Sequence, residues 1–163
     1  MQREIDSAIA GLTPEQLAWH PEGKWCAAEV LEHLFLTYTG TRKGFDRVME
    51  AGKSLARKAT WKDHARALVV VGFGYMPGGR EAPSSARPRG VPAEKVRAEI
   101  GARLAEMDEV MIRCATKFGS RARMLDHPFL GPLSVDQWRK FHLVHGLHHI
   151  KQIRRLQRKH GLK

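Results

Sequence analysis

Apolar residues recur at helical spacing through three long segments of the chain, residues 26–51, 92–118 and 134–159. Each segment is followed within two residues by a glycine, the residue that most often ends a helix. Two shorter segments, 2–10 and 14–18, also carry helix signals, and the second has a proline at its first position. The sequence contains no convincing set of strands. The pattern therefore predicts an all-α, single-domain protein built as a helical bundle.

Two of the long helices are predicted to begin with a capping box, in which the residue before the helix and the third helical residue exchange hydrogen bonds. Ser134 and Gln137 have this pattern. Residues 26–29 have the same layout, but Cys26 stands where serine or threonine normally accepts the hydrogen bond. Sulfur is a weak acceptor. We therefore expect this helix start to be less stable than usual, by up to about 1 kcal/mol.

The middle of the chain is less regular. Thr60–Asp63 is predicted to open a further helix, and the apolar run Leu68–Val71 suits either a helix or a buried strand. Residues 72–92 are rich in Gly, Pro, Ser and Arg and are predicted to form a long loop. Loops of about twenty residues in compact domains are usually functional or disordered. This loop is expected either to cover a functional site or to lack fixed structure.

The overall composition is that of an ordinary globular protein, with 42% hydrophobic and 28% charged residues. The longest apolar run is far shorter than the ~20 residues that cross a bilayer, and the N-terminus lacks the apolar core of a signal peptide. The two cysteines, Cys26 and Cys114, are far apart and form no CxxC motif, which excludes a disulfide framework or a cysteine-based zinc site. We therefore expect a cytoplasmic protein.

Positive charge is concentrated at the end of the chain. The net charge is +11, and eight Lys and Arg residues follow Asp136, after which no acidic residue occurs. Cations in the last turns of a helix are stabilised by its dipole, which explains most of this cluster without a partner. Residues 160–163 are expected to form a basic tail. A nucleic-acid-binding protein is the alternative, but no aromatic residue that could stack on bases follows Phe141.

Histidines are the candidate chemistry, because four of the nine fall within eight residues, as His142, His145, His148 and His149. His145 and His149 are four residues apart, a spacing that directs two imidazoles to one side of a helix. A third ligand must come from elsewhere, and His33, within an apolar helical segment, is the best candidate. Three imidazoles leave coordination positions open, as catalytic metal sites do. The pattern predicts a divalent-metal site of His33, His145 and His149, with Zn, Ni, Fe or Mn as candidate ions.

Other residues leave alternatives open. His142 or His148 could replace one of the predicted ligands. Glu29, one turn before His33, is either a fourth ligand, a hydrogen-bond partner of a ligand, or a charge that stabilises the helix start. Gln152 would either bond a metal-bound water or lie at the surface. Structural or surface roles are expected for the remaining histidines, His20, His64, His127 and His160.

Several motifs recur in a fixed order: Leu12–Leu17, then Gly23–Cys26 with its tryptophan, then Glu29–Leu34 with its His-Leu pair, and finally a stretch from His127–Ser134 to Gln152. In this order and separation they resemble the DinB-like superfamily, and the closing stretch resembles one uncharacterised branch of it. In the superfamily a Trp-Ser step opens the second helix. Here Cys26 replaces that serine.

The resemblance implies a four-helix bundle with a long crossover connection, often homodimeric, that holds a divalent metal through His33, His145 and His149. It also implies metal-dependent thiol chemistry, namely a thiol S-transferase that joins a low-molecular-weight thiol to a small electrophile. A non-catalytic metal-binding or stress-response bundle is the alternative function. No catalytic residue beyond the metal ligands is predicted.

Overall fold

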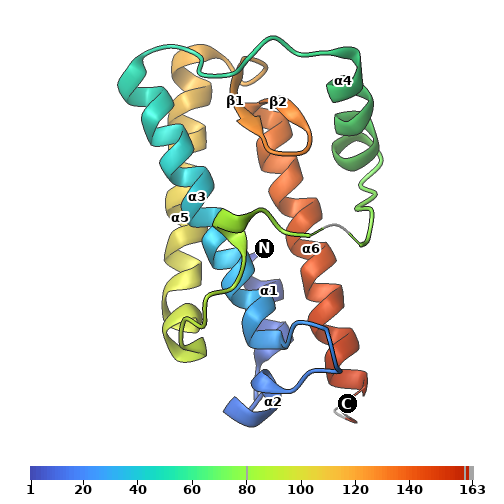
Figure 1. Cartoon of the computed structure of the whole chain (residues 1–163). Helices are drawn as coiled ribbons and strands as arrows, with labels where there is room; N and C mark the ends of the chain where they lie inside the picture. The colour runs from blue at the N-terminus through green and yellow to red at the C-terminus, as the bar shows by residue number, and fades with distance from the viewer. Residues whose placement is uncertain (80, 160, 162–163) are drawn as a thin grey trace.

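Three long helices form the centre of the molecule: α3 (Ala27–Ala51), α5 (Ala93–Phe118) and α6 (Val135–Lys159). Each contacts the other two, and Figure 1 shows them running side by side. The computed structural model describes residues 1–79, 81–159 and 161, and this part of the chain is mostly helical. The three long periodic segments of the sequence are therefore confirmed as helices, with bounds within a residue of those expected.

The shorter elements surround this centre. Helix α1 (Gln2–Ile9) packs against α6, and α2 (Pro14–Ala18) packs against α3. Helix α4 (Trp61–Ala67) continues directly into a single π-helical turn, η1 (Leu68–Gly72), so the apolar run at 68–71 is helical rather than a strand. The predicted loop at 72–92 contains one short 3₁₀ helix, η2 (Ser84–Ala86), which contacts α3.

A two-stranded antiparallel hairpin, which the sequence analysis did not predict, precedes α6. Its strands are β1 (Arg123–His127) and β2 (Gly131–Ser134). The buried imidazole of His127 closes the turn, because its Nδ1 accepts the backbone N–H groups of Phe129 and Leu130 at 3.1 and 3.2 Å. The indole N–H of Trp138 donates to the carbonyl of Leu125, which fastens the hairpin to the first turn of α6.

The capping boxes form as predicted. At the start of α3, Cys26 Sγ accepts the backbone N–H of Glu29 at 3.4 Å, and the Glu29 carboxylate accepts the N–H of Cys26 at 2.8 Å. Ser134 and Gln137 exchange the equivalent pair of bonds at the start of α6. The sulfur atom of Cys26 therefore takes the position of a cap oxygen.

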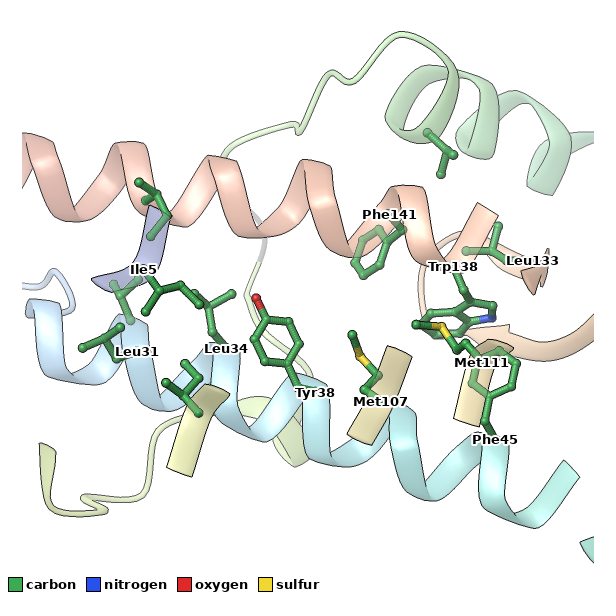
Figure 2. Packing of buried hydrophobic residues seen from close by; sticks show 14 of the residues in the cluster. Ile5, Leu31, Leu34, Tyr38, Phe45, Met107, Met111, Leu133, Trp138 and Phe141 are labelled. Carbon is green, nitrogen blue, oxygen red and sulfur yellow. The ribbon is translucent and has the colours of Figure 1, made fainter. Parts of the chain in front are cut away.

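Large apolar side chains from α3, α5 and α6 meet in one core, shown in Figure 2. Tyr38, Phe45, Met107 and Met111 are each at most 1% exposed. The rings of Phe45 and Trp138 meet edge to face with their centroids 6.0 Å apart. This packing fixes α3 against α6, the two helices that carry the predicted metal ligands.

Some of the positively charged side chains near the C-terminus form ion pairs with acidic residues of the same chain. Arg139 pairs with Asp108 of α5, and Arg154 pairs with Glu4 of α1. The predicted basic tail at 160–163, including His160, lies outside the described residues except for Gly161. Within the described part of the chain, no helix combines the length and the apolar character needed to cross a membrane.

The cap at Cys26 gives a test of stability. Cys26→Ser is expected to raise the free energy of unfolding by about 0.5–1 kcal/mol, because an oxygen accepts the Glu29 N–H better than sulfur does. Urea unfolding at neutral pH measures this change. Cys114→Ser is the control, since that thiol is fully buried in the core and the added polarity should lower stability. Equal stability of Cys26→Ser and the wild type would contradict the prediction.

The turn at His127 gives a test with pH. Burial lowers the pKa of His127 to about 4, whereas the unfolded residue titrates near 6.5. The unfolded chain therefore binds more protons below pH 6.5, and this residue reduces stability by up to about 1.4 kcal/mol per pH unit as pH falls towards 4. Its full contribution to stability is present above pH 6.5.

Asparagine at position 127 keeps an acceptor for the turn but does not titrate. In urea unfolding at pH 7.5, 6 and 5, the stability of the wild type should therefore fall more steeply than that of His127→Asn. The other histidines are common to both proteins, and burial, rather than His127, is the main cause that lowers the pKa of His142 and His145, so most of their titration cancels in the difference. Parallel stability curves for the two proteins would show that His127 is not the titrating group.

Candidate metal centre

The imidazoles of His33 on α3 and of His145 and His149 on α6 converge at one point. The Nε2 atom of His145 lies 3.1 Å from Nε2 of His33 and 3.1 Å from Nε2 of His149. The ligand atoms of the three residues lie within 4.8 Å of one another, and all three side chains are buried. The structure thus brings together the three histidines that the sequence analysis proposed as ligands, although His33 and His145 are 112 residues apart.

Helix geometry explains this convergence. His145 and His149 are one turn apart on α6, and their ring centroids lie 4.5 Å apart. His33 faces them from α3, with its centroid 4.8 Å from that of His149. Phe141, one turn before His145, stacks on the His145 ring at 5.2 Å with an interplanar angle of 19°. The rings are therefore held by the packing of α3 on α6.

Hydrogen bonds to the outer ring nitrogens fix the tautomers of two of these histidines. His33 Nδ1 lies 2.7 Å from the carbonyl oxygen of Ala86, and His149 Nδ1 lies 2.9 Å from Oε1 of Gln152. Both oxygens accept, so each Nδ1 donates a proton. The Nε2 atoms of His33 and His149 therefore present lone pairs to the shared centre. Metal-binding histidines are oriented in this way by partners beyond the metal.

The spacing of the three nitrogens suits a shared cation. Bonds of about 2.1 Å to one ion place two nitrogens about 3.0 Å apart at an octahedral angle and about 3.4 Å apart at a tetrahedral angle. The two separations from Nε2 of His145, 3.1 Å each, lie within this interval, and the ligand atoms of all three residues lie within 4.8 Å of one another. A proton on His145 could satisfy one of the two facing lone pairs, whereas a cation satisfies both. The donor set therefore fits a divalent metal ion.

The surroundings keep these imidazoles neutral. Burial is the main cause that lowers the pKa of all three, and for His149 the value falls to about 3. The neighbouring imidazoles lower the pKa values of His145 and His149 further, because a positive charge on one ring opposes a charge on the next. Neutral imidazole is the form that binds a metal, so the three side chains are ready to bind at pH 7.

The other two histidines of α6 point elsewhere. His142 stacks on Trp138, with centroids 5.7 Å apart and planes at 24°, and also meets the Tyr38 ring edge to face at 5.7 Å. His148 is half-buried and meets the ring of His149 edge-on at 5.2 Å. Neither belongs to the convergent group formed by the described residues. The alternatives that replaced a ligand by His142 or His148 are thus not supported by the geometry.

The two polar residues considered beside the ligands have definite roles. Glu29 is also outside the convergent group, and its carboxylate caps α3 by accepting the N–H of Cys26. This matches the interpretation of Glu29 as a charge at the helix start. Gln152 orients His149 by accepting its Nδ1 proton, a role that the sequence analysis did not assign to it.

A cleft of about 2030 Å³ borders the three histidines. The rings of Trp25 and Phe141 line it beside the histidines, Phe129 lines it as well, and residues of the 76–88 segment form another wall. The ring of Trp25 lies 5.2 Å from that of His33. A metal ion held by the histidines would therefore have coordination positions that face a cavity large enough for small molecules.

Glu32 anchors the loop that reaches His33. Its carboxylate, which is 1% exposed, accepts the backbone N–H groups of Arg89 and Gly90 at 2.7 and 3.1 Å. The adjacent residue, His33, binds the carbonyl of Ala86 in the same loop. The sequence analysis did not single out Glu32, although an acidic residue within an apolar helical segment was a signal that could have done so.

Comparison with known proteins gives a family for the chain. Residues 3–156 match the family described as a protein of unknown function, DUF1569, and the chain belongs to this family. Searches of the curated proteins and of the solved structures found no match. The family assignment therefore covers nearly the whole chain and carries no activity with it.

The Glu32 anchor gives a test of the site. Glu32→Gln keeps the shape of the side chain, but its amide nitrogen donates and cannot accept one of the two N–H groups. The loop should be held less firmly, and the affinity for Zn²⁺ should fall by about tenfold because His33 depends on Ala86 for its orientation. Competition with a chromogenic chelator measures that affinity.

Glu81→Gln provides the matched control, since it makes the same chemical change in the same loop. The Glu81 side chain is 84% exposed and pairs with Arg87 at the surface, so its loss should leave the affinity unchanged. Wild-type affinity in Glu32→Gln would show that the orientation of His33 does not depend on this anchor.

Proposed function

We propose that this protein is a DinB-like four-helix bundle that binds a divalent metal through His33, His145 and His149. The four helices of the proposed bundle are α1, α3, α5 and α6, and the chain from residue 52 to residue 92 is its long crossover connection. The order of motifs in the sequence supports the superfamily, and the mutual contacts of the helices are consistent with a bundle.

One observation carries the metal assignment: the Nε2 atom of His145 lies 3.1 Å from the Nε2 atoms of both His33 and His149, and all three imidazoles are buried and neutral. In His33 and His149 the proton is on Nδ1, which donates to Ala86 and Gln152 respectively. The Nε2 atom of each ring is therefore unprotonated and presents a lone pair. Lone pairs that face one another in a buried site are unfavourable without a cation or a proton between them. A single ion satisfies all three nitrogens at once.

For the activity we propose a metal-dependent thiol S-transferase. A divalent cation at this site would lower the pKa of a bound thiol and so favour the thiolate at neutral pH. In the overall reaction the thiol sulfur forms a bond to an electrophilic carbon, the leaving group departs with its bonding electrons, and the thiol proton passes to solvent. The aromatic walls formed by Trp25 and Phe141 would hold an apolar acceptor and exclude water.

The same geometry suits the alternative, a metal-binding module without turnover, and the two differ only in the chemistry of the cleft. A nucleic-acid-binding protein is less well supported, because Arg139 and Arg154 of the basic segment already pair with acidic residues of the same chain. A homodimer is also part of the proposal, and analytical ultracentrifugation of the purified protein tests it.

The metal assignment predicts the behaviour of single variants. Untagged protein should contain stoichiometric metal by inductively coupled plasma mass spectrometry, and His33→Ala, His145→Ala and His149→Ala should each bind it about tenfold or more weakly. His148→Ala is the matched control, because this half-buried histidine touches His149 but lies outside the group. Full metal content in the three ligand variants would refute the site.

The same proteins separate the two functions. Glutathione, mycothiol and bacillithiol should be tested with a panel of small electrophiles, and conjugate formation followed by mass spectrometry. Turnover that is lost in the three ligand variants and kept in His148→Ala supports the transferase. Stoichiometric metal with no turnover for any thiol supports the non-catalytic module instead.

A further inference from the structure

A group of buried polar atoms without hydrogen-bond partners lies between α3 and α6. Among the residues that the structure describes, four such atoms belong to three side chains: the Tyr38 hydroxyl, both ring nitrogens of His142, and Nδ1 of His145. The three side chains are 0%, 3% and 8% exposed. Buried polar atoms are nearly always paired, with protein or with ordered water. The Tyr38 hydroxyl, one nitrogen of His142 and Nδ1 of His145 therefore indicate a partner that they could share, since one molecule can bond only one of the two diverging nitrogens of His142.

Tyr38 and His142 are neighbours across the helix interface, and His145 follows His142 by three residues on α6, so their side chains lie on one side of that helix. The ring centroids of Tyr38 and His142 are 5.7 Å apart. Figure 2 shows the Tyr38 hydroxyl directed from α3 towards α6. A Cβ atom at Gly146 would meet the side chain of Met1 first and would also lie 3.3 Å from that hydroxyl oxygen, which places the hydroxyl near the α6 backbone beside His145. The absence of a side chain at Gly146 thus leaves room for the Met1 side chain and for the Tyr38 hydroxyl.

The chemistry of these atoms defines what can bind there. Burial raises the pKa of Tyr38 and lowers that of His142 to about 3, so both are neutral at pH 7. Tyr38 then has one O–H donor and an oxygen acceptor, while His142 has one N–H donor and one acceptor nitrogen. A partner for this set must both donate and accept. A cation would leave the donors unpaired, and an anion would leave the acceptors unpaired.

The geometry points to an internal water site formed by Tyr38, His142 and Nδ1 of His145. Water has two donors and two acceptors and bridges buried groups of this kind. Each of the other two convergent histidines has an oxygen partner for its Nδ1, Ala86 for His33 and Gln152 for His149. The water supplies the equivalent partner for His145, which makes Tyr38 and His142 positioning residues for that ligand. This last step rests on the proposed metal site, whereas the water site itself does not.

The water is tested in the metal-free wild-type protein. A crystal structure at a resolution that shows ordered solvent should contain a water within hydrogen-bond distance of the Tyr38 hydroxyl and of a nitrogen of His142 or His145. A dry interface overturns the inference, as does a structure in which these atoms bond directly to protein groups. A metal ion in this position also overturns it. The result does not depend on whether the protein has enzymatic activity.

The positioning role is tested by Zn²⁺ affinity, measured by chelator competition. Tyr38→Phe keeps the ring and removes the hydroxyl, so the affinity should fall by about tenfold. The matched control is Tyr75→Phe, because the Tyr75 side chain is 63% exposed and should leave the affinity unchanged. The Co²⁺-loaded variants give a second readout, since a reoriented His145 changes the visible absorption of the bound ion.

Variants of His142 provide an independent test in case Tyr38→Phe does not fold. His142→Gln retains a donor and an acceptor and should keep most of the affinity, whereas His142→Leu should lose about as much as Tyr38→Phe. Wild-type affinity and an unchanged Co²⁺ spectrum in both Tyr38→Phe and His142→Leu would overturn the positioning role. If the wild type binds no metal, the proposed function fails, and the metal-free crystal structure alone decides the water site.

Discussion

The hydrogen bond between His33 Nδ1 and the carbonyl of Ala86 links the helices, the loop and the candidate site. Because Nδ1 holds the proton, Nε2 of the same ring presents its lone pair to the centre shared with His145 and His149. It also attaches the 84–86 helix to α3, an attachment that Glu32 reinforces from the adjacent position. Two neighbouring buried residues of one helix therefore hold both the loop and a ligand, so that the form of the cleft and the orientation of a ligand depend on the same contacts.

The two sides of α3 differ in the residues that they carry: one faces the core and the other faces the cleft. One side packs large apolar residues such as Tyr38 and Phe45 into the core with α5 and α6. The side that borders the cleft carries His33, Thr37 and Gly40, which are polar or small and leave space beside the helix. A neutral imidazole loses favourable hydration when it is buried, and this free-energy cost does not arise when an apolar side chain is buried. The core with α5 must offset this cost, and the site depends on that core for its rigidity.

The sequence predicted the elements whose signals are local. The long helices have apolar periodicity and end signals within their own residues, and the pair His145 and His149 has a spacing that itself directs the rings to one side. The hairpin at 123–134 was missed, because its stability comes from the turn closed by His127 and from the contact of Trp138 with a strand carbonyl. The hydrogen-bond partner of His33 could not be predicted from the sequence either. It is a backbone oxygen 53 residues away, and any residue type could supply such an oxygen.

The shared contacts also restrict how a small molecule could reach the candidate site. If the loop moved away to admit a molecule, His33 would lose its hydrogen bond to the carbonyl oxygen of Ala86, which keeps the proton on Nδ1. Its Nε2 would then no longer be fixed as the unprotonated nitrogen that can bind a metal. A bound metal would then be held by fewer oriented histidines at the moment when the cleft opened. Retention of the proposed metal would therefore favour entry along the cleft, which Trp25 and Phe129 line, with the Ala86 contact intact. The loop would then be a fixed wall of the cleft, and the side chains that line the cleft would select the substrate of the proposed transferase.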